Sequence, residues 1–163
     1  MKDHKLEVFS LGKIRVSESS WNIEFKTDYK DALTGLEGFS HVQVLFWLHM
    51  HDTPEMRKTI VCNKPYKKAP DVLGIFATRS DYRPNPIGLS ICMIKKLDKE
   101  RGCLELYYID AEDNTPLIDI KPYHPAVDRV KQVKTPAWCS HWPQWYEDAG
   151  NFDWASEFNF PID

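Results

Sequence analysis

The sequence has no hydrophobic run long enough to cross a membrane and no segment typical of export. None of its uncharged apolar runs approaches the roughly 20 residues that a membrane-spanning helix requires. Residues 1–5 carry charges but are not followed by the apolar stretch of a secretory signal, so we expect no export. Hydrophobic residues make up 42% and charged residues 28% of the 163 residues, which is typical of a globular domain with one buried core.

Cysteine pairs and standard metal-ligand spacings are also missing. The four cysteines form no Cys-x-x-Cys motif, and Cys92 and Cys103 lie in apolar stretches, where a free thiol packs as a small hydrophobic group. Cys139 and His141, even together with His124, match no standard zinc pattern, so we expect no bound metal. We therefore predict a cytoplasmic protein with free thiols.

The pattern does not indicate an α/β nucleotide-binding sheet. No Gly-x-Gly-x-x-Gly loop occurs, and no stretch before residue 125 has an apolar period of helix length. Short strand-like stretches separated by Pro or Gly are frequent instead. We predict a mainly β protein, a single-sheet antiparallel β-barrel with few short helices. The expected strands are residues 7–16, 21–26, 41–48, 74–78, 87–94, 102–109 and 117–120, and residues 28–33 are expected to form one helical turn.

Basic residues are absent from the end of the chain. Residues 136–163 contain five acidic side chains, no Lys or Arg, and four of the six tryptophans. The aromatic residues between Trp138 and Tyr146 have the spacing of one face of an amphipathic helix, which Pro143 would kink or interrupt. We therefore divide the chain into a domain of residues 1–135 and an acidic, Trp-rich extension of residues 136–163, which we expect to pack its aromatic face on the barrel.

Residues 74–90 form the most unusual stretch of the sequence. Two prolines bracket Asn85, so Arg83 and Asn85 are restricted to extended conformations and the loop is stiff. Arg79 stands where this loop begins and could bind a carboxylate or phosphate through two parallel hydrogen bonds. A tight turn with a surface pair between Arg79 and Asp81 explains the same residues equally well.

Residues 110–123 form a second polar stretch. Asp119, Lys121 and Tyr123 follow at a period of two and therefore share one face of an extended segment. An acid, a base and a phenol in line could bind a polar substrate, or could form a structural salt bridge only.

The charge pattern permits a polyanionic partner without requiring one. The net charge is −3, which argues against general nucleic-acid binding. Lys64, Lys67 and Lys68 nevertheless fall in one short loop. The simplest interpretation of three lysines is a solvated loop.

Four motifs stand out in the sequence. The first is A-T-R-S-x-x-R-P-N-P-I-G-L-S over residues 77–90, and the second is D-x-T-P-x-x-D-I-K-P-Y over residues 113–123. The others are L-G-x-I-R at residues 11–15 and L-E-G-F-S-H at residues 36–41. Together they resemble the TsaA-like family, which includes the tRNA methyltransferases acting on N6-threonylcarbamoyladenosine beside the anticodon. The resemblance extends over roughly residues 8–125, and the proline-rich motif is long enough to be highly specific.

The resemblance implies a methyltransferase that uses S-adenosylmethionine (SAM), is built on a single β-barrel, and is a homodimer with SAM near the subunit interface. Arg79 is expected to bind the methionine carboxylate, while Asp119 and Tyr123 are candidate catalytic bases. The expected SAM contacts are His49, Met50, Arg79, Leu89, Tyr107, Tyr108, Ile109 and Asp110. Candidate substrate-binding residues are Arg83, Asn85, Lys121, Lys67 and Lys68.

The chain departs from the tRNA-modifying members at three places. Asn114 replaces a turn glycine, residues 16–25 lack a proline-containing segment with Arg and Gln, and the acidic tail has no counterpart. We therefore keep three hypotheses. The first is methylation of N6 of threonylcarbamoyladenosine in tRNA, the second is methylation of a small molecule over which the tail closes, and the third is a SAM-binding regulatory module without catalysis.

Overall fold

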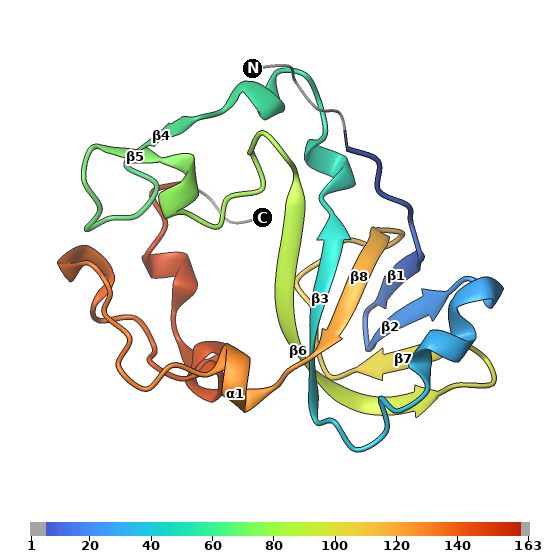
Figure 1. Ribbon diagram of the computed structural model, residues 1–163. Helices are drawn as coiled ribbons and strands as arrows, with labels where there is room; N and C mark the ends of the chain where they lie inside the picture. Colours follow the sequence, from blue (N-terminus) through green and yellow to red (C-terminus); the bar gives the residue numbers. More distant parts are fainter. Residues whose placement is uncertain (1–5, 161–163) are drawn as a thin grey trace. The chain divides into compact units, whose positions relative to one another are not determined.

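Antiparallel strands close into a barrel in the computed structural model, which describes residues 6–160. Within that range six strands form the barrel in the order β1-β2-β7-β6-β3-β8 (Figure 1). Pairing of Gly12 with Leu117 and of Lys13 with Pro116 closes it between β1 and β8. The strands are β1 (Gly12–Ser17), β2 (Ser20–Phe25), β3 (His41–Trp47), β6 (Ile87–Asp98), β7 (Cys103–Leu106) and β8 (Pro116–Pro122). The prediction of a mainly β, single-sheet antiparallel barrel is confirmed.

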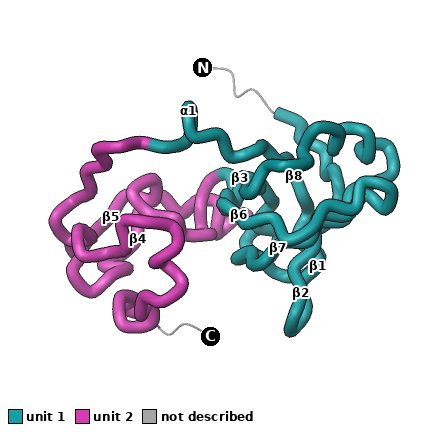
Figure 2. The backbone as a smooth tube through the Cα atoms, turned by 90° about the horizontal axis from the view of Figure 1, so that it is seen from below, with its two compact units in different colours: residues 1–52, 85–129 teal, residues 53–84, 130–163 magenta. Residues whose placement is uncertain are grey.

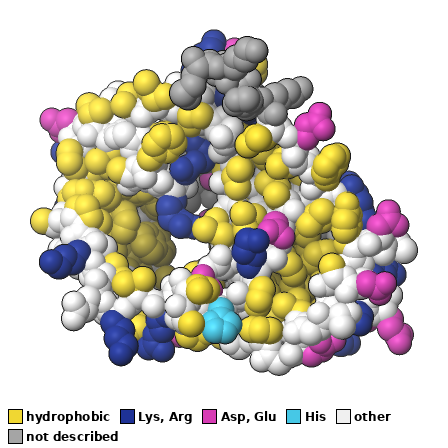
Figure 3. All heavy atoms as spheres, in the orientation of Figure 1, with side chains coloured by type: hydrophobic (Ala, Val, Ile, Leu, Met, Phe, Trp, Pro, Cys, Tyr) yellow, Lys and Arg dark blue, Asp and Glu magenta, His cyan; other side chains and the backbone are white. Residues whose placement is uncertain are grey.

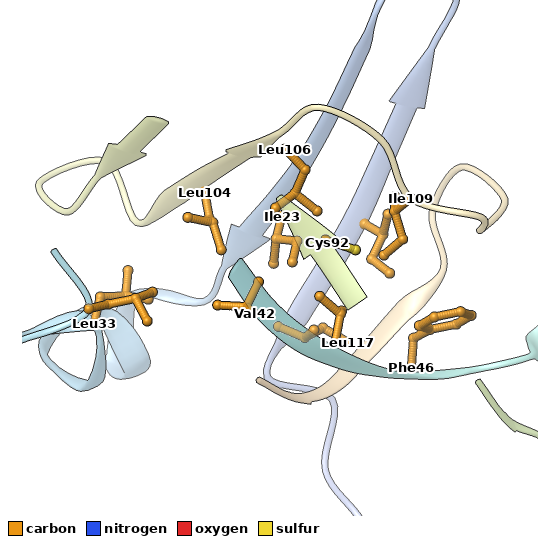
Figure 4. Close-up of a cluster of buried hydrophobic side chains, with 12 residues drawn as sticks. Ile23, Leu33, Val42, Phe46, Cys92, Leu104, Leu106, Ile109 and Leu117 are labelled. Atoms are coloured by element: carbon orange, nitrogen blue, oxygen red, sulfur yellow. The ribbon is translucent and has the colours of Figure 1, made fainter. Parts of the chain in front are cut away.

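The inward faces of these strands make the core. Val42, Val44 and Phe46 alternate along β3 with outward side chains and are all buried. Side chains from the other strands converge on them (Figure 4). Burial raises the pKa of the Cys92 thiol, which lies among these side chains, to about 11. Cys92 is therefore a neutral core residue, and all four cysteines, which lie in the described range, are free.

Two glycines permit close approaches that no other residue would allow. A Cβ on Gly12 would lie 2.1 Å from the carbonyl oxygen of Glu24 on the neighbouring strand. A Cβ on Gly88 would lie 2.2 Å from the ring of Phe46. Both glycines belong to the motifs at residues 11–15 and 77–90, so these motifs have a packing role in addition to any chemistry.

One expected helical turn is present, and one expected strand is replaced by a short turn. The helical turn expected at residues 28–33 is present as the 3-10 helix η1 (Thr27–Leu33). The strand expected at residues 74–78 is instead the end of β5 (Val72–Gly74), followed by the 3-10 turn η4 (Ile75–Ala77). Thr78 closes that turn, because its hydroxyl donates to the carbonyl of Ile75 at 2.8 Å.

The described residues divide into two compact units (Figure 2). The barrel unit takes the described residues up to Asp52 together with Asn85–Arg129, and includes the short helix α1 (Pro125–Asp128). The second unit takes Thr53–Pro84 together with the described residues from Val130 onward. Residues 1–5, on which the expectation of no export signal depends, lie outside the described residues.

The second unit is built from a small sheet, short turns and many aromatic rings. β4 (Val61–Asn63) pairs antiparallel with β5, and 3-10 turns form most of the remaining regular structure. These turns are η3 (Met56–Lys58), η4, η5 (Ala137–Cys139), η6 (Tyr146–Asn151) and η7 (Trp154–Ser156). The helical spacing from Trp138 to Tyr146 is interrupted, as expected, at Pro143, which separates the short turns η5 and η6.

Aromatic rings from residues 137–160 pack on Tyr66, which lies in the loop between β4 and β5. The unit is therefore formed by two stretches far apart in the sequence. The domain boundary predicted at residue 135 stays a prediction. The same holds for the predicted packing of the C-terminal extension on the barrel.

Candidate cofactor and substrate site

The outer face of β6, β3 and β8 carries residues from both motifs in one row. Leu89 on β6 pairs with Leu45 on β3, which pairs in turn with Asp119 on β8. Two strand spacings separate Leu89 from Asp119, or about 10 Å between their backbones. Leu89 is 42% exposed. Figure 3 shows hydrophobic side chains over this face with basic and acidic groups among them.

Asp119 and Lys121 form an ion pair on this outer face. The Lys121 Nζ lies 2.8 Å from Oδ2 of Asp119, and this hydrogen bond raises the pKa of Lys121. The two side chains are 61% and 40% exposed for Lys121 and Asp119, so the pair contributes little to stability. The structural salt bridge considered for this stretch is thus present. To act as a base, the Asp119 carboxylate would have to release Lys121 and accept a proton from the substrate.

Tyr123 follows β8 and contacts the start of β3. Its ring meets the ring of His41 edge-on at 6.4 Å between centroids, and its backbone N–H donates to the His41 carbonyl at 3.0 Å. Asp119 and Lys121 thus bond to each other, while Tyr123 packs on His41.

The end of β3 is where the two motifs meet. His49 lies in the 3-10 turn η2 (His49–His51), and its Nδ1 is 3.4 Å from the hydroxyl oxygen of the buried Thr115 in the second motif. The Leu48 N–H donates to the carbonyl of Pro86 in the first motif at 2.8 Å. Met50 follows as an exposed side chain. Two motifs separated by 22 residues in sequence (residues 91–112) are thereby tied to one turn.

The turn of the second motif is also tied to the first strand. Asn114 has a φ of +63°, a left-handed conformation that glycine adopts without strain and that Asn tolerates. Its side-chain oxygen accepts a hydrogen bond from Arg15, and Oδ1 of Asp113 accepts from the backbone N–H of Val16 at 3.0 Å. This hydrogen bond from Val16 lowers the pKa of Asp113. The substitution of Asn for Gly therefore preserves the turn.

Residues 107–110 follow β7 and combine exposed phenols with a buried anchor. The backbone N–H of Tyr107 donates to the Met93 carbonyl at 3.1 Å, and Tyr108 packs edge-on against Trp21 at 5.6 Å. The two tyrosines are 56% and 55% exposed. Ile109 lies in the core, so any ligand contact it makes is through its backbone. Burial and the neighbouring Asp110 carboxylate raise the pKa of Tyr108.

Four of the basic candidate residues, Lys67, Lys68, Arg79 and Arg83, lie in the second unit, whereas Lys121 lies in the barrel unit. Lys67 and Lys68 are exposed in the loop between β4 and β5. Arg83 donates from Nη1 to the Ser80 carbonyl at 3.2 Å, and the backbone N–H of Arg79 donates to the phenol oxygen of Tyr66. The candidate residues in the barrel unit are His49, Met50, Asn85, Leu89, Tyr107, Tyr108, Ile109, Asp110, Asp119, Lys121 and Tyr123.

Three residues that contact or pair with the candidate residues in the structure were not predicted from the sequence. Thr115 was quoted as part of a motif without a role, Leu45 has only the strand alternation to mark it, and Tyr66 has no sequence signal. Within residues 6–160, no group of three or more His, Cys, Asp or Glu side chains is placed to hold a metal ion. In the same range no helix has the length and apolarity needed to cross a bilayer.

The fold and the site define a protein class. Chemistry-bearing motifs lie at the strand ends and on the outer face of one closed antiparallel barrel, rather than at the switch point of a parallel α/β sheet. Residues 12–129 match the family model described as the tRNA-methyltransferase O N-terminal domain. The chain belongs to this family.

Similar proteins include both SAM-binding proteins and tRNA methyltransferases. A probable S-adenosyl-L-methionine-binding protein of Methanothermobacter thermautotrophicus is 40% identical over 116 residues, which cover 71% of this chain and 78% of that protein. The tRNA (adenine(37)-N6)-methyltransferase of Escherichia coli is 42% identical over 102 residues, covering 61% of this chain and 43% of that protein. A crystal structure of TrmO from Pseudomonas aeruginosa matches with a TM-score of 0.65 at 29% identity, covering 83% of this chain and 62% of that chain. The chain thus spans less than two thirds of the TrmO structure and less than half of the Escherichia coli enzyme.

Proposed function

We propose that this protein is a SAM-dependent methyltransferase acting on tRNA, with N6 of threonylcarbamoyladenosine next to the anticodon as the acceptor. The observation that carries the proposal is the meeting of both family motifs at the end of β3, through His49 with Thr115 and Leu48 with Pro86. The names of the relatives support it, since they include SAM-binding proteins and a tRNA adenine-N6 methyltransferase.

The residues present fit SAM chemically. Exposed aromatic faces at Tyr107 and Tyr108 suit a sulfonium cation and an adenine ring. Arg79 provides a guanidinium for the methionine carboxylate. SAM supplies an already activated methyl group, so the work left to the protein is to position the acceptor for in-line attack. Asp119 and Tyr123 are the groups that would accept the proton of the acceptor nitrogen.

Lys67 and Lys68 would bind the phosphate backbone of the RNA, together with Arg83, Asn85 and Lys121 as further substrate contacts. Exposed lysines bind phosphates without reading sequence, which suits an enzyme directed to one modified nucleoside.

The assembly and location are part of the proposal. The outward residues Ile87 and Leu89 are partly exposed apolar groups on a sheet face, and a second copy of the chain would cover such a face. We infer a homodimer with SAM near the interface. A tRNA substrate and four free cysteines favour the cytoplasm.

A second candidate function is binding of SAM without methylation of tRNA. It is favoured by the coverage of the relatives, because the chain accounts for 78% of a protein named only for SAM binding and for 43% of the Escherichia coli enzyme.

The deciding experiment is transfer of labelled methyl from SAM to tRNA that carries the threonylcarbamoyl group but lacks the methyl group. We expect a methylated product at that nucleoside, identified by mass spectrometry after digestion. Arg79→Ala should abolish the product and weaken SAM binding at least 10-fold, whereas Arg101→Ala, the same change in the hairpin between β6 and β7, should leave both unchanged. SAM binding without a tRNA product would favour the second candidate. Unchanged SAM affinity in Arg79→Ala would remove Arg79 from the site.

A further inference from the structure

The C-terminal segment, to which the proposed function gives no task, packs around one side chain, Tyr66. The Tyr66 ring stacks on Trp138 with 5.4 Å between centroids and 13° between planes. Trp142 meets it edge-on at 4.9 Å, and Phe158 lies tilted at 5.5 Å. Three rings from one segment therefore fix the orientation of a single phenol.

Main-chain pairing joins the same two parts of the second unit. Tyr66 and Phe158 form an isolated antiparallel bridge. The backbone N–H of Asn159 donates to the Pro65 carbonyl at 3.0 Å, and its side-chain amide donates to the Lys64 carbonyl at 2.8 Å. The loop before Tyr66 is thus held at its backbone as well as at its ring.

A buried carboxylate anchors the aromatic rings. Glu157 is only 8% exposed, and its two carboxylate oxygens lie 2.9 Å from Nε2 of His141 and 3.1 Å from the indole Nε1 of Trp142. Its backbone carbonyl accepts from the N–H of Lys67 at 2.9 Å. Trp142, which packs on Tyr66, is therefore held by a charge-assisted hydrogen bond.

The phenol oxygen of Tyr66 reaches the candidate SAM-binding loop. It accepts a hydrogen bond from the backbone N–H of Arg79. The preceding residue, Thr78, is buried and bonded to the Ile75 carbonyl. The main chain at Arg79 is therefore held on one side by the turn η4 and on the other by Tyr66, at the point where the proline-rich loop begins.

We propose that Tyr66 is a positioning residue of the methyl-transfer site, which links the C-terminal aromatic segment to the main chain at Arg79. The inference rests on the proposed role of Arg79 toward the carboxylate of SAM. A guanidinium that meets a carboxylate through two parallel hydrogen bonds tolerates little rotation of its backbone anchor. A segment without any basic residue, which is poorly suited to bind RNA, would thereby contribute to cofactor affinity.

The test is Tyr66→Phe, which keeps the ring and its aromatic neighbours and removes only the phenol oxygen. We expect hydrogen exchange of the Arg79 amide, followed by NMR, to become faster. We expect the Kd for SAM, measured by calorimetry, to rise about 2- to 10-fold, as for the loss of one hydrogen bond. Tryptophan fluorescence should stay as in the parent, because the rings remain packed.

A control variant makes the test specific. Tyr29→Phe makes the same chemical change in the barrel unit. It should bind SAM within 2-fold of the parent. Equal weakening by Tyr29→Phe, or unchanged SAM binding by Tyr66→Phe, would overturn the proposal. A parent protein that binds no SAM would overturn the proposed function, while exchange of the Arg79 amide would still decide separately whether Tyr66 holds that main chain.

Discussion

At the scale of single residues, the packing of Gly88 shows how a motif residue can be required by the barrel itself. The Phe46 ring occupies the space that a Cβ of residue 88 would need, and Phe46 is buried on all sides. The ring cannot turn away without displacing core neighbours. The sequence marks Gly88 by its place in the proline-rich motif, but the reason lies on another strand and could not be predicted.

We expect Gly88→Ala to lower the free energy of unfolding by about 1–3 kcal/mol, because it overpacks the core. Gly74→Ala is the matched control, since no heavy atom lies within 4 Å of its Cβ position and its φ is an ordinary −64°. That change should be neutral or stabilising by up to about 1 kcal/mol. Urea unfolding followed by far-UV circular dichroism measures both. Equal stability of the two variants would contradict the close approach at Phe46.

At the scale of elements, the alternation of apolar and polar residues predicts where a strand lies, but it does not predict where the strand ends. The strand expected at residues 41–48 is present as β3 with the expected inward face. β6 runs beyond the predicted end at Ile94 to Asp98, because it leaves β3 and continues along β7. Lys95 and Lys96 on that second half are polar and exposed, so no apolar alternation marks it.

The C-terminal segment has a pH-sensitive anchor in Glu157. The hydrogen bond from His141, then that from Trp142, lowers the pKa of this carboxyl, and the charge of Lys68 acts in the same direction. A lowered folded-state pKa means that the carboxylate stabilises the fold above the unfolded value of about 4.3, and that this contribution is lost as the pH falls below it.

We therefore expect Glu157→Gln to lower the urea midpoint at pH 7 and to approach the parent as the pH falls below about 4. Tryptophan fluorescence suits the measurement, because four of the six tryptophans lie in the C-terminal segment. Glu147→Gln, at an exposed acid of the same segment, is the control and should change the midpoint little at any pH. A constant difference between Glu157→Gln and the parent from pH 7 to pH 3 would exclude an electrostatic role for the carboxylate.

At the scale of the whole molecule, local charge matters more than net charge. The chain carries −3 overall, yet Lys67 and Lys68 are exposed in one loop and the acidic groups concentrate after residue 136. If the proposed function holds, tRNA affinity depends on that loop and weakens with salt.

We expect Lys67→Ala with Lys68→Ala to weaken tRNA binding and to reduce the slope of log K against log salt by about 1.4, as for two contacts to single-stranded RNA. Lys95→Ala with Lys96→Ala removes the same charge from an adjacent lysine pair on β6 and should leave the slope unchanged. Filter binding from 50 to 200 mM salt measures both. A slope that neither double variant changes would place the phosphate contacts elsewhere.

The barrel class could be predicted from the sequence, and the motifs single out candidate residues, but the contacts of these residues could not be predicted. Motif residues such as Arg79 and Asp119 are visible because their types and spacing are unusual. That Asp119 bonds Lys121 while Tyr123 packs on His41 depends on strand register and side-chain direction, which a period of two does not specify. The spacing from Trp138 to Tyr146 likewise does not identify the partner of these rings, since Trp138 and Trp142 pack on Tyr66, some 70 residues earlier.

The discontinuous second unit has a consequence for the order in which the chain is made. Thr53–Pro84 leave the ribosome well before the residues that complete their unit, including Phe158 and Asn159. Translation at about 5–20 residues per second takes roughly 4–15 s to pass from Pro84 to Asn159. During that interval Tyr66 has none of its three ring partners beyond residue 137, whereas every strand of the barrel has been synthesised once Pro122 is added. The newly made chain therefore exposes the Tyr66 loop to chaperones and proteases until residues 138–159 have been synthesised.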